Sequence, residues 1–419
     1  MKLARPLRAG VITAVLSKLN LSKRSNKMFK KKYPLPIYVL MLAQLIGGID
    51  LIGTFMVRFF RDWGGITQTE TQTLQSLFLI FIFILEIPTG VFGDRKGLKF
   101  SVLSGYAIIG IATVIYGLIP DFRLFVVSEF LFALGVSFIS GAEEALVFET
   151  AKRTGVEKDF GKIQVVRSNL EMISMIAGTG IAALLAQSMI PYNRIFQMQV
   201  IPCFIVFVLL LLVVKEPREH KSQVPDYKEI IGAALKEIRT TKVVKLVTIL
   251  LGINLGGYFV IWLYQVALEG VNVSELSFGS VRIVLLVAEM VFQTYAIKAL
   301  KLNDPKTKAV LAAIVAAGFI LVATRLSIET IYLFVIVSGG IGATARTVFS
   351  PELNEEVSSE NRATALSGIS MLNRISLAVF NPFIGFLADK SVSMAFLAVS
   401  AIVIAAIAIF LLLNRLLTD

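Results

Sequence analysis

The chain has 419 residues, of which 56% are hydrophobic and only 17% are charged, and its mean hydropathy is +0.78. This composition excludes an ordinary soluble domain, in which about a quarter of the residues are charged. The formal net charge is +12, from 41 Lys and Arg against 29 Asp and Glu. Because these bases are spread over short loops, they indicate contact with anionic lipid headgroups rather than nucleic-acid binding.

The first 34 residues are basic and precede the first long apolar run. An apolar stretch at residues 9–16 imitates a signal peptide, but further bases follow it and no small-residue cleavage site does. We therefore expect residues 1–34 to form a cytoplasmic extension rather than a cleaved signal. Translation could start at either Met1 or Met28.

Twelve apolar runs follow, and each approaches the roughly 20 residues that a helix needs to cross the hydrocarbon core. A polar stretch at 215–242 leaves six runs on each side. The sequence therefore predicts an all-α membrane protein with twelve transmembrane helices. They would form two six-helix bundles, at 35–214 and 243–419, joined by a cytoplasmic central loop at 215–242. The runs lie near residues 36–60, 70–92, 100–119, 123–149, 168–190, 194–214, 243–268, 277–299, 308–326, 329–350, 363–388 and 394–414.

The distribution of bases predicts how the chain is oriented in the membrane. If both termini are cytoplasmic, most of the 41 Lys and Arg flank the cytoplasmic ends of the runs. This bias is what the positive-inside rule requires. We expect a multi-pass protein of the plasma membrane, the cytoplasmic membrane of a bacterium, with both termini in the cytoplasm.

A glycine-rich, charged loop separates the second and third runs. Its sequence is Gly90-Val91-Phe92-Gly93-Asp94-Arg95-Lys96-Gly97-Leu98-Lys99. This loop resembles the one between the second and third helices of major facilitator superfamily (MFS) transporters, although Leu98 stands where that pattern usually has a base. Residues 140–149 and 351–367 resemble two further segments of bacterial members. The resemblance implies a secondary transporter built from six plus six helices that works by alternating access.

The loop and one carboxylate of the fourth run are predicted to form a cytoplasmic gate. Arg95 or Lys99 could bind Glu149 and hold this side shut, while Asp94 could accept hydrogen bonds at a helix N-terminus. The alternative is a solvated tight turn. A segment with a similar motif, from Gly385 to Lys390, lies on the outer side of the membrane in this topology. The predicted gate residues are Gly90, Asp94, Arg95, Gly97, Lys99 and Glu149.

Asp50 is the first candidate for coupling transport to an ion gradient. An ionisable side chain inside the membrane is costly, so its presence suggests a function. Asp50 is the only acidic residue of the first run, and the helical spacing puts it on one face with Gly47 and Thr54. Its alternative role is a structural ion pair with Arg374 or another base.

Glu129 and Glu143 on the fourth run are the other candidates for proton or substrate coupling. Glu129 lies toward the outer surface and could instead be merely solvated. Glu143, with Glu144 beside it, could instead pair with Arg346 of the tenth run as an inner gate. Desolvated carboxylates can change their charge state, which favours protons as the coupling ion.

The seventh run carries a polar and aromatic stripe that we predict to line the substrate cavity. The family resemblance implies that the first, fourth, seventh and tenth helices surround this cavity. Tyr258 and Trp262 could alternatively be packing residues. Arg282 and Glu289 on the eighth run share a helix face and are expected to pair with each other. The predicted cavity residues are Asn254, Tyr258, Trp262, Gln265 and Arg346.

Enzyme activity has no support in the sequence. The chain has one Cys and one His, and it lacks a nucleophile elbow, a P-loop and a dinucleotide fingerprint. We expect no cofactor, no metal and no nucleic acid, and a monomer whose partners are a small-molecule substrate, protons and membrane lipids. The favoured function is proton-coupled efflux of a small organic solute. The alternatives are an uptake or facilitated-diffusion carrier, or a non-transporting membrane sensor or scaffold on the same fold.

Overall fold

The computed structural model of the protein describes residues 33–217, 241–299, 304–356 and 362–417. Within these ranges every regular element is a helix and there is no strand, which confirms the predicted all-α fold. Most of the N-terminal extension and of the central loop lies outside the described residues, so the structure does not test either.

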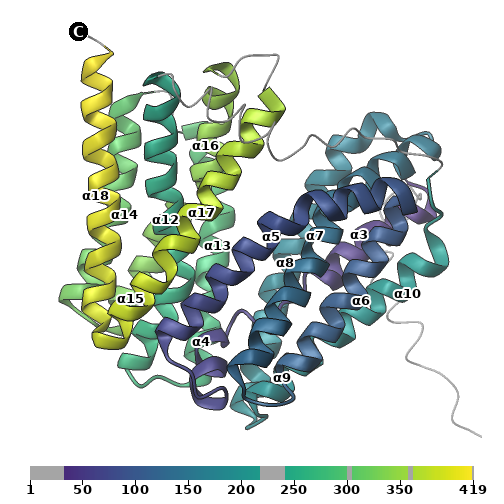
Figure 1. Cartoon of the computed structure of the whole chain (residues 1–419), viewed down its shortest axis with the longest axis horizontal. Coiled ribbons are helices and arrows are strands. Elements are labelled where there is room, and N and C mark those ends of the chain that lie inside the picture. Colours follow the sequence, from purple (N-terminus) through teal and green to yellow (C-terminus); the bar gives the residue numbers. More distant parts are fainter. Residues whose placement is uncertain (1–32, 218–240, 300–303, 357–361, 418–419) are drawn as a thin grey trace, which may run out of the picture.

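The helices of the described part form two bundles that are consecutive in the sequence (Figure 1). The N-terminal bundle contains α3 (Leu35–Gly47), α4 (Met56–Arg58), the π-helix η1 (Phe59–Trp63), α5 (Gln68–Lys96), α6 (Leu98–Tyr116), α7 (Phe122–Arg153), the short η2 (Glu157–Asp159), α8 (Phe160–Gln187), α9 (Tyr192–Met198) and α10 (Val200–Val213). The C-terminal bundle contains α12 (Thr241–Gly270), α13 (Glu275–Ala299), α14 (Pro305–Thr324), α15 (Ile328–Phe334), the π-helix η3 (Val335–Gly339), α16 (Gly340–Glu356), α17 (Arg362–Lys390) and α18 (Val392–Leu416).

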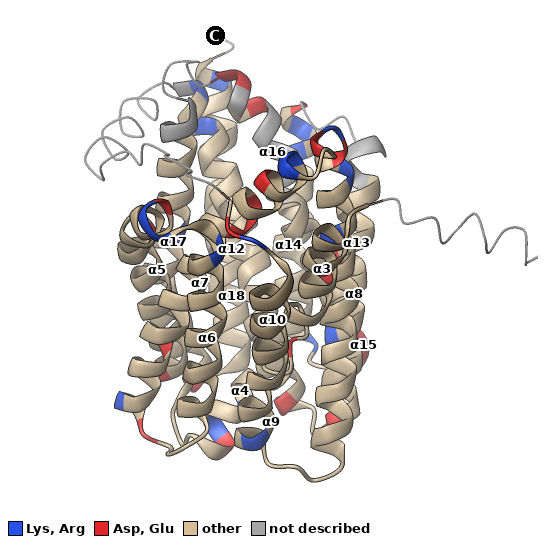
Figure 2. Ribbon diagram, turned by 90° about the vertical axis from the view of Figure 1, so that its right-hand side faces the viewer, with Lys and Arg blue, Asp and Glu red and all other residues tan. Residues whose placement is uncertain are grey.

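Nine helices of the described chain are long and apolar enough to cross a membrane. The other three of the twelve predicted spans correspond to the broken first span (α3, α4 and η1), to α13, and to the continuous run of α15, η3 and α16 in the described part. Lys, Arg, Asp and Glu are most frequent toward the two ends of the bundles, and most of the ribbon between the ends is tan (Figure 2). This distribution fits a protein whose flanks meet water and headgroups while its middle meets lipid tails.

Helix starts follow local capping signals in the sequence. At the start of α5, Thr67 Oγ1 accepts from Glu70 N at 3.1 Å and Glu70 Oε2 accepts from Thr67 N at 2.8 Å, which is a complete capping box. Asp121 Oδ1 accepts from Arg123 N at 2.8 Å at the start of α7. Such caps bind the free N–H groups that every helix start exposes.

The first span is not the continuous helix that the sequence predicted. The helix α3 ends at Gly47, the chain is non-helical from 48 to 55, and helix resumes at Met56. The predicted helical face of Gly47, Asp50 and Thr54 is therefore wrong. Asp50 Oδ1 accepts hydrogen bonds from Ile52 N at 3.0 Å and Gly53 N at 2.8 Å, which competes with the helical hydrogen bonds of this segment.

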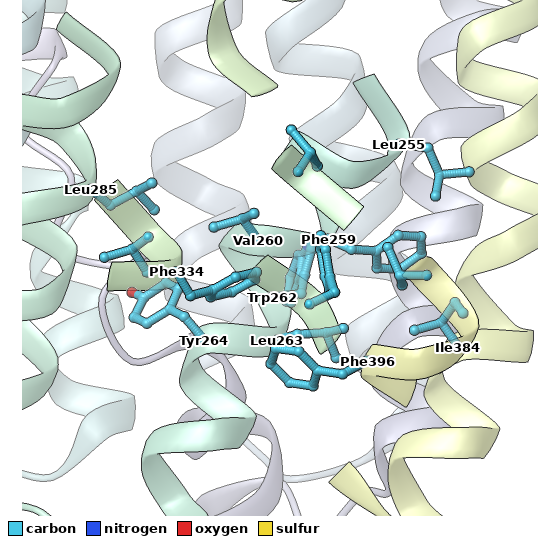
Figure 3. Packing of buried hydrophobic residues seen from close by; sticks show 14 of the residues in the cluster. Leu255, Phe259, Val260, Trp262, Leu263, Tyr264, Leu285, Phe334, Ile384 and Phe396 are labelled. Carbon is cyan, nitrogen blue, oxygen red and sulfur yellow. The ribbon is translucent and has the colours of Figure 1, made fainter. Parts of the chain in front are cut away.

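The two bundles meet at one end of the molecule and splay apart toward the other (Figure 1). We call the end that carries Gly64 and Val273 the joined end, and the end that carries Gly97 and Lys242 the splayed end. The charge distribution predicts that the splayed end faces the cytoplasm. A large apolar cluster fills the C-terminal bundle, with Phe259, Leu263 and Phe396 among its members, and extends to Phe55 and Val57 of the N-terminal bundle (Figure 3).

Candidate functional site

An ion pair between the bundles holds the joined end together. Arg58 at the end of α4 pairs with Glu275 at the start of α13, and both side chains are mostly buried. The hydroxyl of Tyr192 donates to the same carboxylate at 2.9 Å, and the Arg58 guanidinium lies 4.0 Å from the centre of the Phe278 ring. A second pair joins Arg61 to Glu269 of α12. Buried charge pairs of this kind are costly to separate, because each charge would be left without its partner.

The start of α5 is also bound by the other bundle. Asp389 near the end of α17 accepts hydrogen bonds from Gln68 N at 2.7 Å and Thr69 N at 2.8 Å, so it caps α5 from outside. A Cβ atom at Gly385 would lie 2.6 Å from the Gln68 carbonyl oxygen, so only glycine permits this approach. Gly385 and Asp389 belong to the second segment that is similar to the loop motif, from Gly385 to Lys390. The sequence predicted no function for this segment.

Asp50 faces the other bundle from the broken part of the first span. Its Oδ2 lies 3.7 Å from Arg282 Nη2 of α13. The side chain of Arg282 is only 7% exposed, whereas that of Asp50 is 28% exposed. The base that contacts Asp50 is therefore not Arg374, which pairs with Glu86 of α5, but another base, which the alternative also allowed. Arg282, which was expected to pair with Glu289, contacts Asp50.

The two other coupling candidates are bound inside the N-terminal bundle. Glu129 is 3% exposed and its Oε1 accepts from Gln75 Nε2 of α5 at 2.9 Å, so the alternative of a merely solvated Glu129 is wrong. Glu143 Oε1 lies 2.8 Å from Arg167 Nη2 of α8. The side chain of Arg346 lies outside the described residues, so its pairing with Glu143 stays a prediction.

A cavity of about 370 Å³ opens among α12, α13 and α16. Asn254 and Tyr258, both predicted cavity residues, line it together with Glu289 and Gln293 of α13, which the prediction missed. The hydroxyl of Tyr258 accepts a hydrogen bond from Asn381 Nδ2 at 3.1 Å. The four-residue spacing of Glu289 and Gln293 is the helical signal that could have placed both on one face. The full lining is Asn254, Gly257, Tyr258, Ile261, Glu289, Gln293, Gly342 and Ala343.

Two other residues of the predicted stripe lie elsewhere. Trp262 is 6% exposed and belongs to the apolar cluster of the C-terminal bundle (Figure 3). Gln265 is 1% exposed and binds the backbone of the first span: its Oε1 accepts from Val57 N at 3.2 Å and its Nε2 donates to Gly53 O at 3.1 Å. Within the stripe, Asn254 and Tyr258 therefore line the cavity. Trp262 lies in the apolar cluster and Gln265 at the bundle interface.

The predicted gate lies at the splayed end, where α5 turns into α6. Gly90, Asp94 and Arg95 belong to the last turns of α5, and Gly97 makes the turn with a φ of +111°. Side chains rarely tolerate this φ, so the turn requires glycine.

A carboxylate beyond α10 binds the same turn. Glu216 accepts from Lys99 N and from Phe100 N, each at 3.1 Å, and the Lys99 ammonium donates to Leu211 O at 2.8 Å. Glu149 lies in the last turns of α7. Its contact with Arg95 or Lys99 stays a prediction.

The chain matches the profile of the Major Facilitator Superfamily over residues 35–375. It belongs to that superfamily. The family resemblance of the loop from Gly90 to Lys99 is thereby confirmed, and the protein is a multi-pass membrane protein. Which membrane it occupies and which side its termini face stay predictions.

Similar proteins agree with this assignment. The uncharacterized MFS-type transporter YxaM of Bacillus subtilis (strain 168) is 29% identical over 203 residues, which are 47% of this chain and 49% of that protein. The match thus spans about half the length of YxaM. The nucleoside transporter NupG has the same fold, with a TM-score of 0.75 at 14% identity over 91% of this chain and 100% of NupG. So does a bacterial homologue of the human lysosomal transporter Spinster in an inward-facing and occupied conformation, with a TM-score of 0.70 at 15% identity over 90% of this chain and 96% of the homologue.

Proposed function

We propose that the protein exports a small organic solute with a cationic group, by alternating access and in exchange for protons. The observation that supports this proposal is the cavity, because its lining combines the carboxylate of Glu289 with the carboxamides of Asn254 and Gln293. A volume of about 370 Å³ suits a small organic molecule. A carboxylate in a low-dielectric site favours a cation as its partner. Export rather than uptake is the direction that we expect from the family resemblance.

Arg282 links this cavity to the bundle interface. Arg282 and Glu289 lie seven residues apart on α13 and so share one helix face. Arg282 also faces Asp50 of the other bundle at 3.7 Å. A cation at Glu289 repels the guanidinium, and a proton on Asp50 neutralises the guanidinium's partner. Both events weaken the same contact between the bundles, which is the link that coupled transport needs.

Asp50 suits coupling better than the two other predicted carboxylates. Glu129 is bound to Gln75 and Glu143 to Arg167, all within the N-terminal bundle. Their contacts can survive a rigid-body motion of one bundle against the other. The contact of Asp50 with Arg282 cannot, because the two residues belong to different bundles.

Flux into proteoliposomes with an acidic interior tests the cavity. We expect organic cations to accumulate while neutral analogues of equal size do not. Glu289→Gln should reduce this accumulation at least about tenfold, because it removes the charge that a cation would contact. Glu157→Gln, a charge loss at an exposed residue outside the cavity, serves as the control and should transport normally. Equal transport of the neutral analogues, or normal transport by Glu289→Gln, would contradict the proposed substrate class.

Asp50→Asn tests the coupling separately. The amide imitates the protonated carboxyl group, so we expect gradient-driven accumulation to be lost while exchange of substrate for substrate persists. Both quantities are measured in the same proteoliposomes with and without a pH gradient. If the variant still concentrates substrate, the proton is carried elsewhere, and Glu129 and Glu143 become the next residues to test.

A further inference from the structure

The non-helical segment of the first span, residues 48–55, lies in the interior of a membrane protein. Backbone N–H and C=O groups without partners are costly there, because no bulk water can bind them. The side chain of Asp50 binds the N–H groups of Ile52 and Gly53. Backbone hydrogen bonds bind the N–H groups of Gly48, Ile49 and Phe55. Two glutamine side chains outside the segment bind further groups.

Each glutamine binds one C=O and one N–H of this backbone. Gln199 Oε1 accepts from Leu51 N at 3.0 Å, and its Nε2 donates to Ile49 O at 2.7 Å. Gln265 repeats this pattern at the end of the segment, where its partners are Gly53 O and the N–H of Val57 in the first turn of α4. The two carboxamides are 8% and 1% exposed and replace hydrogen bonds that a continuous helix would make for itself.

The two glutamines differ in the bundle that carries them. Gln199 stands between α9 and α10, in the same bundle as the segment, whereas Gln265 belongs to α12 of the other bundle. A motion of one bundle against the other therefore leaves the contacts of Gln199 intact and breaks those of Gln265. Asp50 lies between Ile49 and Leu51, the residues that Gln199 binds. Its carboxylate accepts from the N–H of Gly53, whose carbonyl oxygen Gln265 binds, and it faces Arg282.

We propose that Gln265 is a positioning residue of the transport cycle, which keeps the first span unwound and Asp50 opposite Arg282 only while the joined end is shut. When that end opens, residues 53 and 57 lose their partner on α12. The backbone then regains its hydrogen bonds by winding toward a helix, and Asp50 leaves Arg282. Opening of the joined end thus changes the surroundings of the proposed proton site. This inference rests on alternating access but not on the identity of the substrate.

Thr54 supports this reading. Its hydroxyl is fully buried and has no hydrogen-bond partner among the described residues. Leaving a buried hydroxyl without a partner is unfavourable. In a wound helix the same hydroxyl would reach the carbonyl oxygen of Asp50, four residues earlier, as threonines in helices commonly do. The segment therefore holds a group that is unsatisfied in the unwound form and satisfied in the wound form.

The experiment measures from which side of the membrane the cavity can be reached. Asn254→Cys places a thiol in the cavity lining, in a Cys203→Ser background that removes the only native cysteine. Sealed vesicles of both orientations are treated with a membrane-impermeant maleimide, and the ratio of the two labelling rates is compared between Gln265→Met and Gln199→Met. These variants remove the same kind of contact from the same segment and differ only in the bundle that made it.

We expect Gln265→Met to increase labelling from the joined end about tenfold relative to labelling from the splayed end, since two hydrogen bonds that favour closure are lost. Gln199→Met should lower the thermal stability but change the ratio less than about twofold. Gln265→Asn, whose shorter side chain cannot span both partners, should give a smaller shift and covers the case in which the methionine variant does not fold. An unchanged ratio in the Gln265 variants, or an equal shift in Gln199→Met, would overturn the proposal. Because no substrate is needed, a wrong substrate assignment does not affect this outcome.

Discussion

Two helix starts in this protein are bound by a carboxylate from a distant segment, and their positions differ in an instructive way. At the joined end, Asp389 of the C-terminal bundle caps α5 of the N-terminal bundle. At the splayed end, Glu216 caps α6 from the chain directly after α10, the last helix of the same bundle. The chemistry is the same, but only the first contact crosses the interface. The joined end is therefore held by contacts that a motion of one bundle against the other must break, whereas the contact of Glu216 with the start of α6 moves with its bundle.

Arg58→Met breaks the joined end most severely. It removes the guanidinium that binds Glu275 and covers Phe278, and it leaves a mostly buried carboxylate without its ionic partner. We expect the closed joined end to lose about 2 kcal/mol, less than a fully buried pair because both side chains retain some exposure. The side-of-access measurement at Asn254→Cys reports the change. Arg194→Met, at an exposed arginine of the same end, is the matched control and should have no effect.

Asp389→Asn and Glu216→Gln test the comparison directly. Each removes the charge of a carboxylate at a helix N-terminus, which costs about 1 kcal/mol. We expect Asp389→Asn to shift the cavity toward access from the joined end by about fivefold, since 1 kcal/mol corresponds to this factor. Glu216→Gln should lower the free energy of unfolding by about 1 kcal/mol as well, which a lower melting temperature reports. It should not change the side from which the cavity can be reached. Equal shifts in both variants would show that the location of the cap does not matter.

Asp94→Asn addresses the predicted gate at the splayed end and has the smallest expected effect. The change removes a charge but little volume, so expression and membrane insertion should stay near normal while transport falls. A double-mutant cycle with Glu149→Gln measures whether the two carboxylates act through a common base. We expect a coupling free energy of about 0.5–1 kcal/mol in transport rates. Additive effects of the two substitutions would contradict the gate and show that the loop is only a solvated turn.

The helices could be predicted from the sequence because hydropathy is a local property. The sixth apolar run was predicted to end at residue 214, and α10 ends at Val213. The break of the first span could not be predicted, because its partners Gln199 and Gln265 are distant in the sequence. Hydropathy also says nothing of Gly178, whose missing side chain leaves room for the unwound backbone: a Cβ there would lie 2.5 Å from Asp50 N.

The contacts of the site residues could not be predicted either, because they too join segments that are distant in the sequence. The sequence marked Asp50 and Glu143 as unusual because ionisable groups rarely lie inside apolar runs. It could not identify Arg282 and Arg167 as their partners, since helix pairing between distant segments decides which base reaches which acid. Glu289 was assigned to an internal pair on α13 for the same reason, although it lines the cavity.

The wall of the cavity between α12 and α16 is formed where two backbones touch. A Cβ atom built on Gly342 would lie 2.4 Å from the Cα of Gly257, and one on Gly257 would lie 2.8 Å from the Cα of Gly342. No residue is smaller than glycine, so no substitution can enlarge the cavity at this wall. Any other residue there must push the two helices apart. Room for a bulkier molecule must therefore come from other lining residues, such as Asn254 of α12 and Gln293 of α13, whose side chains can be shortened. On the side of Gly257 and Gly342, the size of the molecules that the protein can evolve to accept is limited by the peptide chain itself.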